Sequence, residues 1–234
     1  MTVDPGMRTV TTWYLEQTAP GDLREAPGPE PSAGVRIVRA QVPSAEFSRF
    51  LYASVGADVE WTDRLPWPGA RWQEWLERPG VETWVAYERG TPAGFMELDG
   101  ASPDTSARAT RPGRAVEISY FGLLPAFRGR RIGAHLLGFG AARAWDMAER
   151  WPDREPTNRV WLHTCTKDGP HALRNYQRRG FRIFAKEVAQ EPAAPAANAS
   201  ATPASAGQGP APAAPLVPRP DRREPSQGSR PADM

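Results

Sequence analysis

The strongest constraint on the fold is the stretch from residue 116 to residue 147, VEISYFGLLPAFRGRRIGAHLLGFGAARAWDM. Its first part, residues 116–124, is mostly β-branched, aromatic or aliphatic, and it ends at Pro125, which cannot donate a hydrogen bond to a sheet. Beyond it, small and apolar residues recur every three or four positions, which is typical of a helix face that packs closely on a sheet. The stretch therefore predicts a strand, a basic turn at residues 128–131, and a helix.

The basic turn lies where the predicted helix begins. The first N–H groups of a helix have no partner inside it, and the helix dipole adds partial positive charge there. Arg128, Arg130 and Arg131 bring full charges to the same place, so the site favours phosphate. The turn has neither the Gly-Lys-Ser/Thr of a P-loop nor the three spaced glycines of a dinucleotide fingerprint. Neither of these nucleotide-binding classes is indicated.

Two separated motifs resemble those of the GNAT superfamily, the GCN5-related N-acetyltransferases, in their bacterial type. Residues 128–134, Arg-Gly-Arg-Arg-Ile-Gly-Ala, are similar to its Arg-x-x-Gly-x-Gly/Ala motif, with Arg131 where the first glycine usually stands. Residues 172–181 match the Ala-x-x-x-Tyr-x-x-x-Gly-Phe pattern with which GNAT proteins end. The resemblance covers roughly residues 35–188.

The resemblance implies an α/β (α+β) fold of the GNAT type. This fold is a twisted mixed sheet with flanking helices, whose central strands splay around an acyl-CoA site. The splayed strands would be residues 116–124 and 159–166. The remaining sequence pattern agrees with such a sheet. It predicts strands at residues 9–17, 35–40, 81–88, 93–98 and 180–188, a helix that begins after Ser44, and helices at residues 70–78 and 170–179.

Composition sets the expected domain boundaries. After about residue 190 the chain is rich in Pro, Ala, Ser and Gly and has almost no large apolar residues, so it cannot bury enough surface to offset its ordering entropy. We expect an N-terminal strand segment at residues 1–18, a Pro/Gly-rich linker at 19–34, the acyltransferase domain at 35–189, and a disordered Pro/Ala-rich tail at 190–234. Alternatively, the tail is a proline-rich docking segment.

Charge and residue usage exclude several other classes of protein. With 234 residues and a net charge of +2, the chain gives no reason to expect a nucleic-acid partner. One cysteine and three histidines exclude an intrachain disulfide and make a metal site unexpected. No apolar run is long enough for a signal peptide or a membrane span. We expect a cytoplasmic monomer or homodimer with no membrane partner.

By the resemblance, acetyl-CoA is the acyl donor and two segments would bind it. The main chain of Phe121, Gly122 and Leu123 would pair with the pantetheine arm, and an N–H there would polarise the thioester carbonyl. The basic turn and the start of the helix would hold the diphosphate with their backbone amides. These residues are Arg128, Gly129, Arg130, Arg131, Ile132, Gly133 and Ala134.

Two residues are candidates for proton transfer. Glu117 lies in an apolar strand, where desolvation makes a carboxylate a stronger base, and it stands six residues before Leu123, as the catalytic glutamate does in the similar yeast-type histone acetyltransferases. Tyr176 would protonate the departing sulfur, because the family keeps a tyrosine at this place. The alternatives are that Glu117 pairs with Arg114, that Tyr176 only packs on the sheet, and that His163 is the base.

The segment from Trp61 to Trp67 is aromatic and broken by proline, and it lies where GNAT proteins usually keep the acceptor loop. Aromatic rings and carboxylates can hold a cationic amine. Trp61, Asp63 and Trp67 are therefore predicted acceptor contacts. Trp72 and Trp75 have helical spacing and are expected in the core.

These patterns predict an N-acetyltransferase that transfers an acetyl group from acetyl-CoA to a primary amine by direct attack in a ternary complex. A second interpretation is a GNAT-like module that binds or senses acyl-CoA without turnover. A third is a scaffold that works through its proline-rich tail. The sequence does not identify the acceptor amine.

Overall fold

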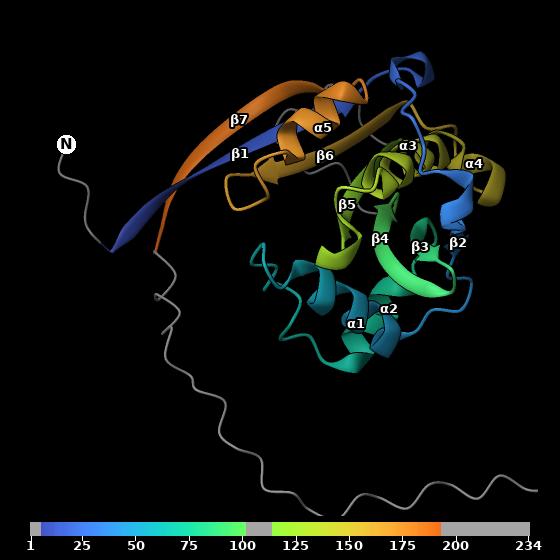
Figure 1. Cartoon of the computed structure of the whole chain (residues 1–234), viewed down its shortest axis with the longest axis horizontal. Coiled ribbons are helices and arrows are strands. Elements are labelled where there is room, and N and C mark those ends of the chain that lie inside the picture. The colour runs from blue at the N-terminus through green and yellow to red at the C-terminus, as the bar shows by residue number, and fades with distance from the viewer. Residues whose placement is uncertain (1–5, 102–113, 193–234) are drawn as a thin grey trace, which may run out of the picture. The chain divides into compact units, whose positions relative to one another are not determined.

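A seven-stranded mixed sheet runs through the part of the chain that the structure describes (Figure 1). The computed structural model describes residues 6–101 and 114–192. The strand order is β2-β3-β4-β5-β6-β1-β7, and β5 and β6 form its parallel pair. The mixed sheet confirms the predicted fold class. The strands are β1 Met7–Gln17, β2 Val35–Arg39, β3 Val81–Glu88, β4 Thr91–Asp99, β5 Ala115–Leu123, β6 Arg159–Cys165 and β7 Arg182–Pro192.

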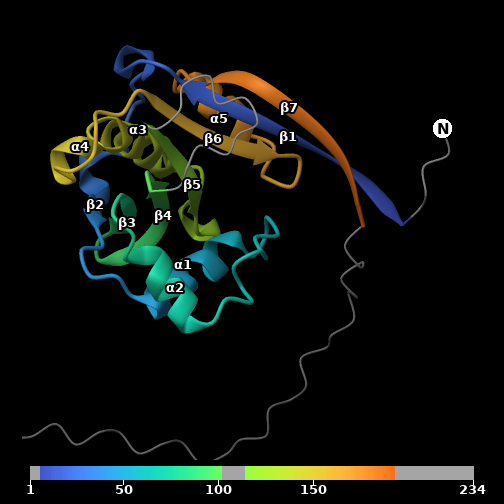
Figure 2. The same cartoon turned by 180° about the vertical axis from the view of Figure 1, so that it is seen from behind.

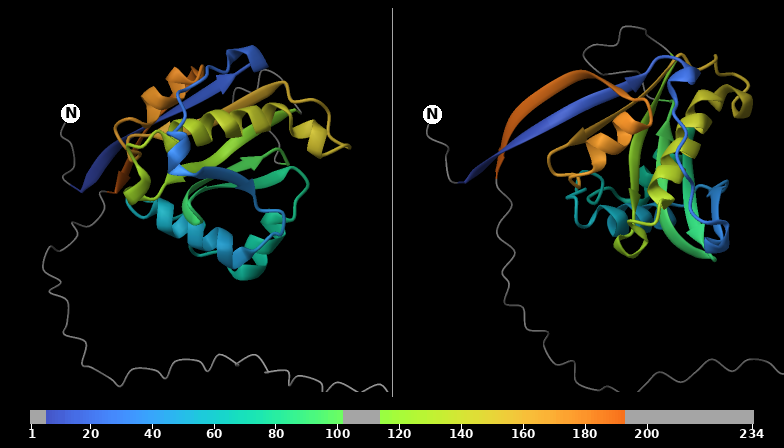
Figure 3. Two further views of the ribbon diagram at one scale, coloured as in Figure 1. Left: turned by 45° about the vertical axis from the view of Figure 1, so that its right-hand side comes forward. Right: turned by 45° about the horizontal axis from the view of Figure 1, so that its top comes forward.

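Helices cover both faces of the sheet (Figure 3). The α-helices are α1 Ala45–Gly56, α2 Gly69–Leu76, α3 Ile132–Trp145, α4 Met147–Arg150 and α5 Ala172–Arg178. The short 3-10 turns among the described residues are η1 Pro20–Asp22, η2 Pro31–Ala33 and η3 Pro125–Phe127. Helices α1 and α2 share one core cluster with the sheet, and α3 and α5 share the other. None of the described helices combines the length and the apolar character that crossing a bilayer requires.

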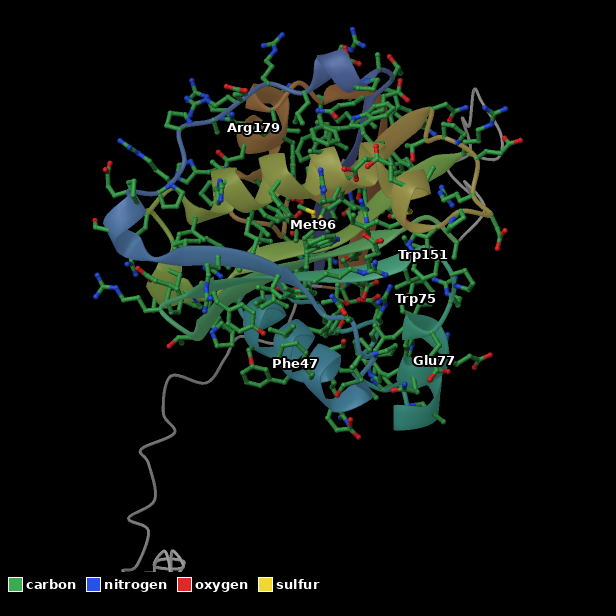
Figure 4. All side chains as sticks on the ribbon, turned by 90° about the vertical axis from the view of Figure 1, so that its right-hand side faces the viewer. Phe47, Trp75, Glu77, Met96, Trp151 and Arg179 are labelled. Carbon is green, nitrogen blue, oxygen red and sulfur yellow. The ribbon has the colours of Figure 1, made fainter. Side chains whose placement is uncertain are left out.

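Small residues allow α3 to lie close to the sheet. A Cβ added at Gly140 would come 1.9 Å from the sulfur of Met96, and Ala141 and Ala144 are fully buried. Figure 4 shows Met96 between α3 and the strands. The helix spacing in the sequence therefore marks the face that packs on β4 and its neighbours.

Strand β1 lies inside the sheet, between β6 and β7. It pairs antiparallel with both neighbours, with Thr12 opposite Cys165 on one side and Glu187 on the other. Leu15 is fully buried in the larger core cluster. Figure 2 shows β1 and β7 running together beyond the end of β6. The expected boundary at residue 35 thus falls between two strands of one sheet.

The predicted linker packs against the body of the sheet and its helices. Leu23 contacts the larger core cluster, and the Arg24 amide donates to the Arg179 carbonyl oxygen at 3.3 Å. Gly180, with a φ of 90°, ends α5 so close to this segment that an added Cβ would lie 1.7 Å from the Asp22 carbonyl oxygen. Glycine is therefore required at this helix end.

Strand β7 extends to Pro192, so residues 190–192 are strand although the sequence assigns them to the tail. The rest of the predicted tail lies outside the described residues. Residues 102–113, between β4 and β5, also lie outside the described residues.

Candidate active site

The two central strands separate after a short stretch of pairing. Three positions of β5 pair with β6, and the last of them is Glu117 opposite Trp161. Both strands continue beyond this point, to Leu123 and Cys165, without further mutual pairing in the described chain. The resemblance predicts that these two strands separate. The predicted strand ends, at residues 116–124 and 159–166, differ from the observed ends by at most one residue.

A β-bulge at Ser119 lies at the start of the separated part. Tyr120 pairs with Glu97 and Ile118 pairs with Leu98, so Ser119 is the extra residue on β5. The bulge places Glu117 and Tyr120 on the same face of the sheet. In a regular strand, residues three positions apart point to opposite faces. The Ser119 hydroxyl is buried and has no hydrogen-bond partner among the described residues.

Glu117 contacts His163 across the point where β5 and β6 separate. Its Oε1 lies 3.4 Å from the Nδ1 of His163, and the two side chains are 20% and 49% exposed. Because the carboxylate stabilises the protonated imidazole, the pKa of His163 is raised. Arg114 pairs with Glu155 instead, so the alternative in which Arg114 is the partner of Glu117 is wrong.

Asp63 is held by two tyrosine hydroxyls next to the separated part of β5. Tyr52 donates to Oδ1 at 2.6 Å and Tyr120 donates to Oδ2 at 2.5 Å. Burial raises the pKa of both phenols, so they remain donors. Burial alone would raise the pKa of Asp63, but the tyrosine hydrogen bonds outweigh it and the pKa is lowered. Asp63 therefore presents a negative charge on the face that carries Glu117.

The predicted aromatic acceptor contacts divide into two groups. The ring of Trp61 lies 5.0 Å from that of Tyr120 and 5.6 Å from that of Tyr52, so it stands beside Asp63. Trp67 instead lies 5.5 Å from both Trp72 and Trp75. Trp72 is buried, as its helical spacing predicts.

Arg64 fills an aromatic box made by Trp67, Trp75 and Tyr120. Its guanidinium carbon lies between 4.1 and 4.9 Å from the three ring centroids. Its Nη1 also lies 2.8 Å from Glu97 Oε1, and Trp75 donates to the same oxygen at 3.0 Å. These contacts hold the loop between α1 and α2 and so place the adjoining Asp63. No local sequence pattern predicts the roles of Arg64, Glu97, Tyr52 and Tyr120, because their partners are distant in the sequence.

Tyr176 lies on the other face of the sheet. Its ring is buried and stands 6.1 Å from Phe121 and 6.3 Å from Phe181. Burial raises the pKa of its phenol. Within the described residues its hydroxyl makes no hydrogen bond, so a neutral donor is present beside the separated strand. The gap between β5 and β6 therefore has Glu117 on one face and Tyr176 on the other.

The basic turn has the backbone shape that favours glycine at two positions. Gly129 has a φ of 74°, and Arg131 has a φ of 63° and a ψ of −2°. Arg131 thus keeps the left-handed conformation at the position where the related motif usually has glycine. The amides of Gly129, Arg130 and Arg131 donate no hydrogen bond within the described chain. This row of free amides at the start of α3 suits a diphosphate.

Carboxylates from distant parts of the chain pair with all three arginines of the turn. Arg128 pairs with Asp58, Arg130 with Glu88 and Arg131 with Glu30. The arginine side chains are 42–61% exposed. The net positive field of the turn is therefore weaker than the sequence alone indicates, because no local pattern reveals these partners.

Several of the other predicted donor-site residues are packed against neighbouring side chains. The side chains of Leu123 and Ile132 are buried. An added Cβ at Gly133 would meet Leu123 at 3.4 Å, and one at Gly122 would meet Val55 at 2.5 Å, so both glycines face packed side chains.

The basic turn borders open space. A pocket of about 300 Å³ is lined by Gly129, Arg130, Arg131 and Ile132 together with Pro29, Glu30 and Ala33. Ala134, in the first turn of α3, is partly exposed. Across residues 6–101 and 114–192, no group of three or more His, Cys, Asp or Glu side chains is arranged to hold a metal ion.

Comparison with known proteins agrees with this geometry. The model of the Acetyltransferase (GNAT) family matches residues 45–181, more than half of the chain. No curated protein sequence matches it. A GCN5-related N-acetyltransferase from Kribbella flavida has 22% identity and a TM-score of 0.51, over 79% of this chain and 59% of that one. Another, from Sphaerobacter thermophilus, has 17% identity and a TM-score of 0.53, over 80% of this chain and 53% of that one.

The two solved structures are similar in fold, and this chain spans between half and three fifths of their length. The family match includes the separated strands, the basic turn and Tyr176. The chain belongs to the GNAT acetyltransferase family.

Proposed function

We propose that the protein transfers an acetyl group from acetyl-CoA to a primary amine by direct attack in a ternary complex. The observation that carries this proposal is the gap between β5 and β6, which has a proton acceptor on one face and a proton donor on the other. Glu117 stands where the strands separate. Tyr176 packs on Phe121 in the separated part of β5. A ligand lying in the gap would meet both groups.

The donor side has two features that fit an acyl-CoA. The amides of the basic turn and of the first residues of α3, from Gly129 to Ala134, donate to no acceptor among the described residues outside α3 and would hold the diphosphate, with Arg128 beside them. The main chain of Phe121, Gly122 and Leu123, which β6 does not pair, would hold the pantetheine arm. The buried Ser119 hydroxyl, which has no hydrogen-bond partner in the part of the chain that the structure describes, lies where β5 leaves β6. Bound acetyl-CoA supplies the thioester and the thiol leaving group.

The acceptor side favours a cationic amine. Asp63 presents a charge that two tyrosines hold in place, and the aromatic ring of Trp61 lies beside it. An ammonium bound here loses a proton towards Glu117 before its nitrogen attacks the carbonyl carbon. Tyr176 then protonates the sulfur as the carbon–sulfur bond breaks. Trp67 stands further from this point, in the aromatic box of Arg64.

The test is thiol release from acetyl-CoA with a panel of amines. Removing a general acid or base typically costs about a hundredfold or more in rate. We therefore expect Glu117→Gln and Tyr176→Phe to lower kcat by about that factor, with CoA affinity unchanged by calorimetry. Glu74→Gln and Tyr87→Phe serve as matched controls, because both side chains lie away from the gap.

Two outcomes would count against the proposal. If CoA binds and stabilises the protein but no amine is acetylated, the chain is a sensor of acyl-CoA. If both variants keep full activity, the roles assigned to Glu117 and Tyr176 are wrong.

A further inference from the structure

The carboxylate of Glu117 also contacts a histidine, His163. His163 Nδ1 lies 3.4 Å from its Oε1, and within the described residues the imidazole makes no other hydrogen bond or ion pair. The two residues come from different strands, β5 and β6, and the contact spans the point where these strands separate. The pair therefore stands where the separated part of the two strands begins.

The two members of this pair differ in their access to solvent. The side chain of Glu117 is 20% exposed and that of His163 is 49% exposed. An amine that arrives from solvent reaches the ring before the carboxylate. Since Nδ1 faces Glu117, Nε2 is the ring nitrogen that remains for an acceptor.

Carboxylates from three neighbouring segments favour a protonated ring. Glu117 of β5, Asp168 after β6 and Asp63 of the α1–α2 loop all raise the pKa of His163, while burial opposes them. Tyr14 of β1 lies with its ring 6.0 Å from the imidazole and donates to Glu187 of β7. No cation is among these neighbours in the described chain, so a proton taken up by the ring is stabilised.

We propose that His163 and Glu117 form a catalytic dyad, in which His163 takes the proton of the acceptor amine and Glu117 orients the ring through Nδ1. The inference rests on the proposed acetyl transfer and changes the role of Glu117 from base to positioning residue. A carboxylate that holds one imidazole nitrogen fixes the tautomer and leaves the other nitrogen as the base.

The proton balance is complete with the groups present. The ammonium gives one proton to Nε2 of His163, which releases it to solvent through its exposed edge. The nitrogen lone pair then forms the bond to the carbonyl carbon, and the carbon–sulfur bond breaks with its electron pair going to sulfur. Tyr176 protonates the sulfur, and the second proton lost by the nitrogen restores the phenol. One acetyl amide, one thiol and one free proton result.

Steady-state kinetics of the full chain tests the dyad. We expect His163→Gln and Glu117→Gln each to lower kcat by about a hundredfold. The double variant is expected to be no slower than either single variant, because residues that act as one unit are not additive. His171→Gln, at an exposed position before α5, is the matched histidine control and is expected to keep full activity.

The pH dependence gives a readout that a structural role would not move. The base works only when unprotonated, so kcat/KM rises with pH through the raised pKa of His163. Removing the Glu117 charge lowers that pKa, so Glu117→Gln shifts the rise to lower pH. His163→Gln abolishes it.

A measurement without turnover completes the test. NMR titration of the imidazoles follows all three histidines, and Glu117→Gln is expected to lower the pKa of His163 alone. An unchanged His163 pKa overturns the dyad. So does a His163→Gln variant with wild-type kcat and an unaltered pH profile, which leaves Glu117 as the base and the proposed function intact. A wild type that acetylates no amine overturns both.

Discussion

The arginines of the basic turn and Arg64 of the α1–α2 loop all pair with carboxylates, but in opposite surroundings. At the turn the arginine side chains are 42–61% exposed, whereas Arg64 and Glu97 are 5% and 2% exposed. Exposed pairs contribute roughly 0–1 kcal/mol to stability. Breaking a buried pair by removing one partner costs about 3–5 kcal/mol, because a charge is left without compensation.

The difference in burial implies that ion pairs break at different cost in the two regions. At the turn, Asp58 and Glu30 are 47% and 76% exposed, so these two carboxylates can leave their arginines at small cost and a phosphate can replace them. Glu88, the partner of Arg130, is only 9% exposed. In the α1–α2 loop, the buried Arg64–Glu97 pair and the aromatic box fix the backbone next to Asp63. We infer that the donor end exchanges partners and that the acceptor end is preorganised.

The largest expected effect comes from breaking the buried pair. Arg64→Met leaves Glu97 unpaired, and we expect the free energy of unfolding in urea to fall by about 3–5 kcal/mol at neutral pH. Arg71→Met is the control, since Arg71 is exposed and stacks on Trp67 from outside. A loss below about 1 kcal/mol for Arg64→Met, no more than an exposed pair contributes, would contradict the comparison.

The same variant has a distinctive pH dependence. Burial raises the pKa of Glu97 even with Arg64 present. A group whose pKa is higher in the folded state favours folding below its unfolded pKa, and that contribution is lost as pH rises through the folded pKa. Arg64→Met removes the opposing positive charge, so its destabilisation relative to wild type is expected to grow from acid to neutral pH. Equal destabilisation at pH 4 and pH 7, measured in urea series, would argue against this account.

Asp63 gives a smaller effect, on binding rather than stability. Asp63→Asn removes the charge but keeps oxygen and shape, and we expect the KM for a cationic amine to rise about tenfold, equivalent to roughly 1.4 kcal/mol. CoA affinity is expected to stay constant. If the KM for neutral and cationic acceptors changes equally, Asp63 does not recognise charge.

A still smaller effect is expected at the turn. Asp58→Asn frees Arg128 from its carboxylate, so CoA affinity is expected to rise about threefold at low salt, less than 1 kcal/mol. The gain should shrink as salt is added, because exposed charges are screened. Calorimetry at two ionic strengths measures both. Affinity that does not change would show that Arg128 is not exchanged between carboxylate and phosphate.

The smallest effect concerns the left-handed Arg131. Arg131→Gly relieves a conformation that costs an ordinary residue about 1–2 kcal/mol, but it adds unfolded-state entropy, so we expect a gain in unfolding free energy of about 0.5 kcal/mol. Arg130→Gly, at a position without positive φ, is expected to lose stability. CoA affinity within twofold of wild type would agree with binding through the amide.

Local pattern predicted much of the fold. The sequence analysis places β3 at residues 81–88, as observed, and places β5 and β6 within one residue of their ends. These strands are apolar runs bounded by turn residues, so periodicity alone identifies them. Tyr176 and the basic turn were found because both belong to motifs of fixed spacing.

The features that the sequence did not reveal depend on contacts between distant residues. The bulge at Ser119, which brings Tyr120 to the face of Glu117, follows from strand register and not from local composition. The hydrogen bonds to Asp63 join residues 11 and 57 positions apart. The carboxylate partners of the arginines come from three different segments. Side-chain type alone does not indicate which charges meet.

The position of β1 has a consequence for how the chain is made. Thr11 and Thr166, joined by a hydrogen bond, stand 155 positions apart, so β1 leaves the ribosome long before β6 and cannot join its neighbours until they follow. Assembly with such high contact order is slow. Until β6 and β7 emerge, β1 has unpaired edges that can bind other nascent chains. When many chains are synthesised at once, those that still lack β6 and β7 are expected to aggregate through the exposed edges of β1.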